Sequence, residues 1–168
     1  MNRALKALMV ISFLLACSAH SDGASGQPTP IAPQGLTSLE AGSGKSKVRV
    51  TIATYEGGVN EAPARRIRTL TAASHVSLVQ DMEIRVGDRR LFVPLSVFSD
   101  LTDLRGGSLR VGAKILVLTL SGGDASESYV VTVEFDRERV RRRTLASAME
   151  PKSPLEEARY YTVVVKDE

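Results

Sequence analysis

The sequence predicts an all-β protein: a single antiparallel β-sandwich or barrel of about seven to nine strands, with little helix. From Lys47 onward, apolar and polar residues alternate with the two-residue period of half-buried strands. These runs are short, and Gly, Pro and Asp separate them at the intervals expected of antiparallel hairpins. No internal repeat of about 20–50 residues is present, so the sequence does not indicate a solenoid or propeller.

The first half of this region contains one strand and one hairpin. Val48, Val50 and Ile52 alternate with polar residues, which predicts a strand with one buried face. Residues 82–93 predict a hairpin, because an alternating arm reaches the Gly87-Asp88 turn and the returning arm stops before proline.

The second half contains two further hairpins. Residues 109–120 predict a hairpin whose later strand, 115–120, is apolar on both faces and should be central in its sheet. Residues 129–135 have one clean apolar face. The chain should end in a strand over 160–165, and residues 95–101 and 156–160 each have the pattern of a short helical turn.

The charged run 136–143 allows two interpretations. As a hairpin with Arg137-Glu138 at its tip, it places Phe135 opposite Val140, and Glu134 and Thr132 opposite Arg141 and Arg143, with Arg142 toward the apolar side. The alternative is a helix over 136–149. We favour the strand, because that register keeps the apolar residues on one face.

The N-terminus has the layout of a secretory signal peptide. Arg3 and Lys6 precede an apolar run from Ala7 to Ala16, which is too short to cross a bilayer and ends at Cys17. Leu14-Leu15-Ala16-Cys17 resembles the lipobox of bacterial lipoproteins. That resemblance implies removal of residues 1–16, lipidation of Cys17 and attachment to a membrane, and Ser18 favours the outer membrane facing the periplasm.

The expected organisation is therefore a signal peptide (1–16), a lipidated Cys17 with a flexible tether (17–46) and a β domain (47–168). Ser, Gly, Pro, Ala and Thr make up 20 of residues 18–46, too few of which are large and apolar to offset the entropy of ordering. A tether of this length could extend to about 100 Å.

Charge and composition exclude several functions. The chain has 22 Lys and Arg against 19 Asp and Glu, and two of the basic residues leave with the signal peptide. The mature chain is then nearly neutral, so no nucleic-acid partner is expected. Gly42-Ser43-Gly44-Lys45-Ser46 lacks the first glycine of a P-loop, so no nucleotide is expected. One cysteine and two histidines exclude paired-thiol and two-histidine sites, and we expect no metal and no cofactor.

Two segments are candidates for partner binding. The first is a polar glycine-rich loop with Ser121, Asp124, Glu127 and Tyr129. It resembles, at a longer spacing, the Ser-Gly…Tyr loop of periplasmic lysozyme inhibitors, which implies an inhibitory partner-binding role; an ordinary hairpin loop is the alternative. The second is a patch of Arg139, Arg141 and Arg143 that could bind an anion or a protein partner. The alternative is that these arginines form a solvated structural face without a binding role.

The sequence accordingly favours a non-catalytic protein-binding module of the inhibitor, immunity or envelope-assembly type, with a periplasmic protein as partner. A carrier for a small apolar ligand in a barrel cavity is the alternative. A weak hydrolase centred on His75 is a third hypothesis.

Overall fold

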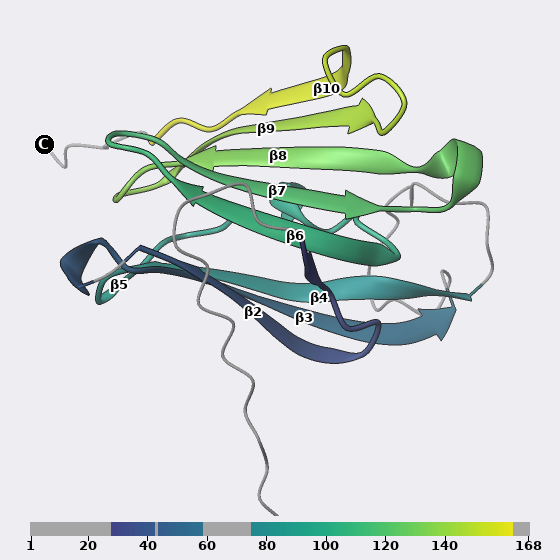
Figure 1. The fold of residues 1–168 in the computed structure, drawn as a ribbon, viewed down its shortest axis with the longest axis horizontal. Helices are drawn as coiled ribbons and strands as arrows, with labels where there is room; N and C mark the ends of the chain where they lie inside the picture. Colours follow the sequence, from purple (N-terminus) through teal and green to yellow (C-terminus); the bar gives the residue numbers. More distant parts are fainter. Residues whose placement is uncertain (1–27, 43, 59–74, 163–168) are drawn as a thin grey trace, which may run out of the picture.

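The protein is an all-β sandwich, in a computed structural model that describes residues 28–42, 44–58 and 75–162. Two antiparallel sheets pack face to face (Figure 1). The six-stranded sheet has the order β1 (Thr29–Pro30), β6 (Leu104–Val111), β7 (Leu116–Gly122), β8 (Tyr129–Phe135), β9 (Val140–Ser147), β10 (Pro154–Arg159). The four-stranded sheet has the order β2 (Gly35–Ala41), β3 (Val48–Gly58), β4 (His75–Val86), β5 (Arg89–Arg90).

The predicted fold class is confirmed, and the open pair of sheets makes it a sandwich rather than a barrel. The described residues form ten strands, not seven to nine. Helical structure is limited to three single turns: η1 (Gly44–Ser46), η2 (Leu95–Val97) and η3 (Ala125–Glu127). The predicted hairpins at 82–93 and 109–120 are present, and β7 lies inside its sheet as its apolar sequence requires.

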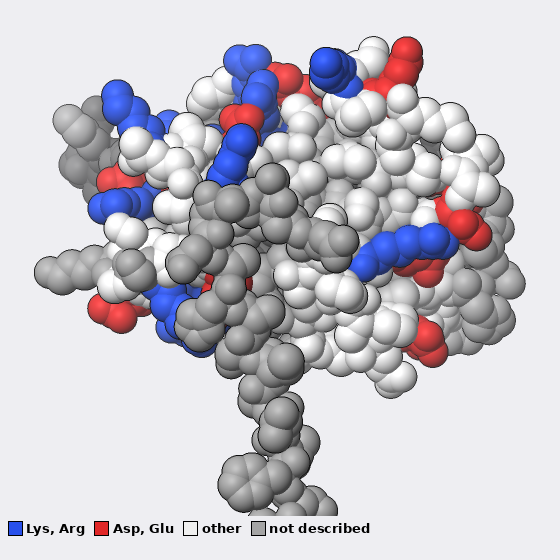
Figure 2. Space-filling view, in the orientation of Figure 1, with Lys and Arg blue, Asp and Glu red and all other residues white. Residues whose placement is uncertain are grey.

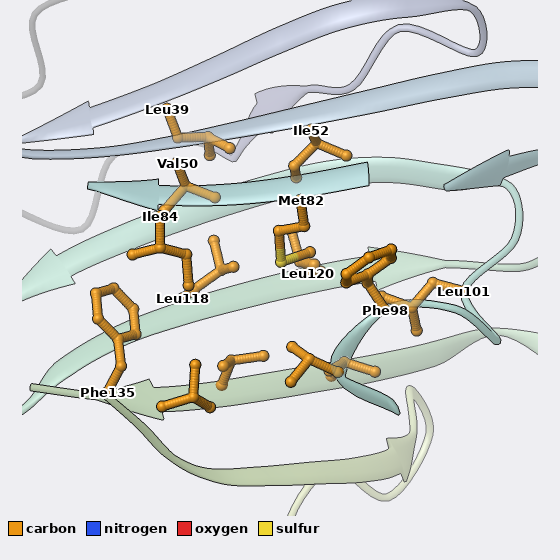
Figure 3. Packing of buried hydrophobic residues seen from close by; sticks show 14 of the residues in the cluster. Leu39, Val50, Ile52, Met82, Ile84, Phe98, Leu101, Leu118, Leu120 and Phe135 are labelled. Carbon is orange, nitrogen blue, oxygen red and sulfur yellow. The ribbon is translucent and has the colours of Figure 1, made fainter. Parts of the chain in front are cut away.

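Alternation along the strands builds the core. In β7 and β8 every second residue is buried, so one face of each strand is turned to the facing sheet. Figure 3 shows Val50, Ile52 and Ile84 of the four-stranded sheet packed toward Leu118 and Phe135 of the other. Side chains of one continuous cluster fill the space between the sheets.

Residues 28–42 and 44–46 belong to the folded domain, so the predicted boundary at Lys47 is wrong. β1 pairs with β6 of one sheet, and β2 pairs with β3 of the other, so this segment joins the two sheets along one side. Ile31 and Leu39 are buried at 6% and 3% exposure. A strand buries only alternate residues, so two large apolar side chains are enough to hold a polar segment in place.

The last described strand is β10, over 154–159, and not the predicted 160–165. Residues 156–160, expected as a helical turn, are extended because they pair with β9 from Leu145 to Arg141. Residues 163–165 of the predicted strand, and the unassigned segment 64–72, lie outside the described residues.

The hairpin prediction for 136–143 is confirmed, but its register is correct only at Phe135 and Val140. A β-bulge follows, so that Glu134 lies opposite Arg142, and Val133 opposite Arg143. Arg141 is the extra residue of the bulge. Because the alternation is shifted there, Arg143 points inward and Arg142 outward, the reverse of the prediction.

Asp136 explains the bulge. Its Oδ1 accepts hydrogen bonds from the backbone N–H groups of Glu138 and Arg139 at 2.7 and 2.9 Å. Its Oδ2 accepts from the Arg141 guanidinium. One carboxylate thus closes the turn and holds the extra residue on the outer face.

A connecting segment, residues 91–103, closes the side of the sandwich opposite β1 and β2. Leu91, Val97, Phe98 and Leu101 bury their side chains in the core. Tyr129 fixes the end of this segment: its hydroxyl donates to the Thr102 carbonyl oxygen at 2.5 Å and accepts from the Thr102 N–H at 3.0 Å. Burial raises the pKa of Tyr129 far above its ordinary value, so the hydroxyl keeps the proton that it donates.

We predict that Tyr129→Phe destabilises the domain by about 1–3 kcal/mol, because the buried N–H and carbonyl of Thr102 lose their partner. Tyr55→Phe is the matched control, since Tyr55 is only partly buried on β3. Urea unfolding followed by circular dichroism measures both. Equal stability of the two variants would contradict the assigned role of the Tyr129 hydroxyl.

Candidate functional site

Arg143, predicted to belong to a surface patch, is instead a structural residue inside the sandwich. Its side chain is 1% exposed, and its guanidinium forms three bonds, two to segment 91–103 and one to β10. Nε donates to the Val97 carbonyl oxygen at 3.2 Å, Nη2 to Asp100 Oδ2 at 2.6 Å and Nη1 to Glu156 Oε1 at 2.7 Å. The prediction that Arg143 contacts a partner is therefore wrong.

Of the four residues predicted to bind a partner through this loop, Tyr129 is excluded, because it is 4% exposed and bonded inside the protein. Ser121 lies on β7, where its hydroxyl donates to the Gly106 carbonyl oxygen at 3.4 Å. Asp124 caps η3 by accepting from the Ala125 N–H at 2.9 Å, and it forms an exposed ion pair with Arg105. Glu127 is exposed in η3. This is the geometry of a capped hairpin connection.

The two predicted sites lie at opposite ends of the sandwich. The 121–129 loop joins β7 to the start of β8, whereas Arg139 and Arg141 follow the end of β8. The seven residues of β8 separate these ends by about 20 Å. They cannot form one compact binding site.

Arg139 and Arg141 do contribute to a hollow in the surface, together with residues that the sequence did not single out. A shallow depression of about 310 Å³ lies beside β9 and β10. Among the described residues, its lining consists of arginine and tyrosine: Arg139, Arg141, Arg142, Arg159, Tyr160 and Tyr161. We call this the Arg/Tyr depression.

A second, larger hollow of about 510 Å³ adjoins it at the same end of the sandwich. The turns 112–114 and 136–138 form much of its wall, and Arg141 borders both hollows. Arg137 donates to the Ser46 hydroxyl at 3.3 Å, which links the two sheets across this end.

Carboxylates hold most of the guanidinium groups of the depression in place. Arg141 pairs with Asp136, Arg142 with Glu134 at 2.5 Å, and Arg159 with Glu157 at 2.6 Å. Figure 2 shows Lys and Arg side chains next to Asp and Glu side chains along the upper edge, where β9 and β10 lie. The surface is therefore an ordered mixture of charges, and not a block of one sign.

The pKa values follow these pairs. The hydrogen bond from Arg159 lowers the pKa of Glu157, and Glu157 raises the pKa of Arg159 in return. Burial acts to raise the pKa of Asp136, but the N–H groups of Glu138 and Arg139 and the Arg141 guanidinium outweigh it, so the net pKa is lowered. The carboxylates stay ionised over the physiological range, which keeps the arginines oriented.

Arg159, Tyr160 and Tyr161 were missed because the last strand was predicted to begin at Tyr160. In the structure this strand begins at Pro154, so that Arg159 lies opposite Arg142 on β9. The Tyr160 N–H then donates to the Arg141 carbonyl oxygen at 2.9 Å. The only signal in the sequence was the run Arg159-Tyr160-Tyr161, which combines two residue types enriched at protein interfaces.

Cys17 lies outside the described residues, as does the side chain of His75, whose backbone begins β4. Within the described part of the chain, no group of His, Cys, Asp or Glu has the arrangement of a metal site. Across 28–42, 44–58 and 75–162, no helix has the length and apolar character needed to cross a membrane.

Comparison with known proteins gave no match to any family model, to any curated protein or to any solved structure.

We predict that Arg143→Met destabilises the domain by about 3 kcal/mol. Asp100 is 17% exposed, and its Oδ1 is buried without a hydrogen-bond partner, so loss of the guanidinium leaves a poorly hydrated carboxylate. Arg143→Met/Asp100→Asn should recover part of the loss by removing that charge. Chemical unfolding measures all variants.

Arg142→Met is the control on the outer face of the same strand, and we expect it to cost about 0–1 kcal/mol. A similar cost for Arg142→Met and Arg143→Met would show that burial of the Arg143 network contributes nothing to stability.

Proposed function

We propose that this chain is a lipid-anchored envelope protein that binds another protein without catalysing a reaction. The observation that carries this proposal is the Arg/Tyr depression. Arg and Tyr are the residue types, with Trp, that most often dominate the binding energy of protein interfaces. Here they line one hollow together, held by carboxylates on neighbouring strands.

The filled sandwich favours this proposal over the carrier of an apolar ligand. A carrier needs a cavity lined by apolar groups, whereas Leu118, Leu120, Phe135 and their neighbours occupy the space between the sheets. Both hollows described above lie at the surface and have charged residues in their walls.

The partner should present an acidic surface with apolar groups. Arg139 is the guanidinium of the depression for which the described residues supply no carboxylate. Arg141, Arg142 and Arg159 retain side-chain exposures of 42%, 39% and 62% despite their ion pairs. Partner carboxylates can therefore form additional bonds to guanidinium groups that are already oriented.

The anchor limits where binding takes place. Eleven peptide units separate Cys17 from Pro28, where the described sandwich begins. A chain of that length extends to about 40 Å at most, whereas a tether ending at Lys47 could extend to about 100 Å. If Cys17 is lipidated, the domain stays close to the membrane, which we propose is the outer membrane on its periplasmic side.

Anchoring predicts that Cys17→Ala leaves the protein unacylated and releases it from the membrane fraction. The measurement is fractionation of cell envelopes, with metabolic labelling by a fatty acid. Ser18→Ala serves as the control and should remain membrane-bound and labelled. Membrane retention and labelling of Cys17→Ala would contradict the lipoprotein assignment.

Partner binding predicts that Arg139→Glu/Arg141→Gln weakens capture of a specific envelope protein at least about tenfold. Arg89→Glu/Arg110→Gln is the control with the same change of charge, at exposed positions away from the depression. The chain from residue 17 onward is used as bait, the captured protein is identified by mass spectrometry, and its Kd is then measured directly at several salt concentrations. Thermal unfolding confirms that both variants fold.

Equal binding by both double variants would contradict use of the Arg/Tyr depression. Recovery of a stoichiometric apolar molecule from the purified domain, without any specific protein, would favour the carrier instead.

A further inference from the structure

The last strand leaves one edge of the larger sheet unpaired. β10 ends the strand order, and no other described strand lies on its outer side (Figure 1). The Tyr160 N–H bonds to β9, and successive residues of a strand direct their backbone groups to opposite sides. The N–H and C=O groups of Glu157 and Arg159 therefore point away from β9, where another strand could pair with them.

Glu157, Arg159 and Tyr161 alternate along the outer face of this edge, and Leu155 lies at the β-bulge between Pro154 and Glu156. Leu155 and Tyr161, 73% and 76% exposed, lie at its two ends. Glu157 and Arg159 lie between them, both exposed. The edge thus presents an apolar group, an acid, a base and a second apolar group in order.

This order is self-complementary about Ala158. In an antiparallel pair related by a two-fold axis at Ala158, Glu157 lies opposite Arg159 of the second copy, and Tyr161 comes near the exposed Leu155 at the bulge. On the inner face of such a pair, Glu156 lies opposite Tyr160 of the second copy. Opposite charges and exposed apolar groups are matched in both directions.

The backbone supports the same register. Glu157 and Arg159 both direct their N–H and C=O groups outward, so each opposing Glu157–Arg159 pair can form the two bonds of a hydrogen-bonded pair. Ala158 then meets itself at a non-hydrogen-bonded pair, where side chains come closest and a methyl group fits. A two-fold axis at Glu157 or Arg159 would place like charges opposite each other.

Pairing would give Arg159 a second carboxylate. In the single copy Arg159 lies directly opposite Arg142 on β9, and the two guanidinium groups share Glu157, which is 2.6 Å from Arg159 and 3.6 Å from Arg142. Glu157 of a second copy would lie on the other side of Arg159, in the position of an opposing carboxylate.

We propose that this chain pairs with a second copy of itself through β10, which joins two six-stranded sheets into one continuous sheet. This inference goes beyond partner binding and does not depend on it. Arg159 and Tyr161 belong to both surfaces, but Arg139 and Arg141, which test partner binding, lie on the β8–β9 hairpin. Leu155 of the second copy would come to lie beside Tyr161, at the border of the Arg/Tyr depression.

Charge reversal tests the register on the chain from residue 17 onward, with Cys17→Ser to prevent oxidation. Glu157→Arg places arginine opposite Arg159, and Arg159→Glu places two carboxylates opposite each other, so each variant alone should dimerise about tenfold or more weakly. A mixture of the two variants should form the heterodimer, and Glu157→Arg/Arg159→Glu should restore the homodimer. Sedimentation equilibrium over a range of concentrations measures the association.

The heterodimer and the double variant show that the single variants fold and fail only in pairing. A monomeric original chain at all concentrations would overturn the proposal, as would failure of the mixture to associate.

Disulfide trapping tests the same contact in the full-length chain in cells. Ala158→Cys should form a disulfide-linked dimer on mild oxidation, because Cα atoms at a non-hydrogen-bonded pair lie about 4.5 Å apart. Ser108→Cys, exposed on β6 of the same sheet, is the control and should stay monomeric. Equal trapping of both cysteines, or trapping of neither, would count against pairing at β10.

Discussion

The Arg143 guanidinium is the interaction on which the closed side of the sandwich depends. It extends from β9 and joins β10 to the segment 91–103, with one bond to Glu156 on β10 and two bonds to Val97 and Asp100 of the segment. A lysine could not replace it, because an ammonium group lacks the rigid fork that reaches Asp100, Glu156 and a carbonyl oxygen together. The bulge at Arg141 is what turns this side chain inward, so the network follows from a local irregularity in one strand pair.

The two sides of the sandwich are closed by different means. On one side, the chain itself crosses from β1 in one sheet to β2 in the other. On the other, segment 91–103 packs apolar side chains into the core and is held by the Arg143 network and by the Tyr129 hydroxyl. Among the described residues, the ends of the sandwich present oriented charges, and β10 is an edge strand with no further strand partner.

These surfaces give the domain its most specific features. The Arg/Tyr depression combines side chains from two strands that are neighbours only because β10 returns beside β9. Three of its arginines, Arg141, Arg142 and Arg159, are oriented by Asp136, Glu134 and Glu157. This would reduce the conformational entropy that the proposed binding must overcome. With both copies confined to a membrane by the proposed anchor, even weak pairing along β10 would be favoured by the high local concentration.

The sequence alone was sufficient to predict the all-β class, the hairpins at 82–93 and 109–120, and the central place of β7, because a two-residue period reports directly which face of a strand is buried. The sequence is also the only basis on which we propose lipidation of Cys17. It did not predict that the polar segment 28–46 folds, that Arg143 rather than Arg142 faces inward, or that Arg159 and Tyr161 join Arg139 and Arg141. Those outcomes depend on strand partners and on one bulge, and a single extra residue reverses the side to which every later side chain points. The alternation of apolar and polar residues can be predicted from the sequence alone, whereas the register depends on how the strands pair in the tertiary structure.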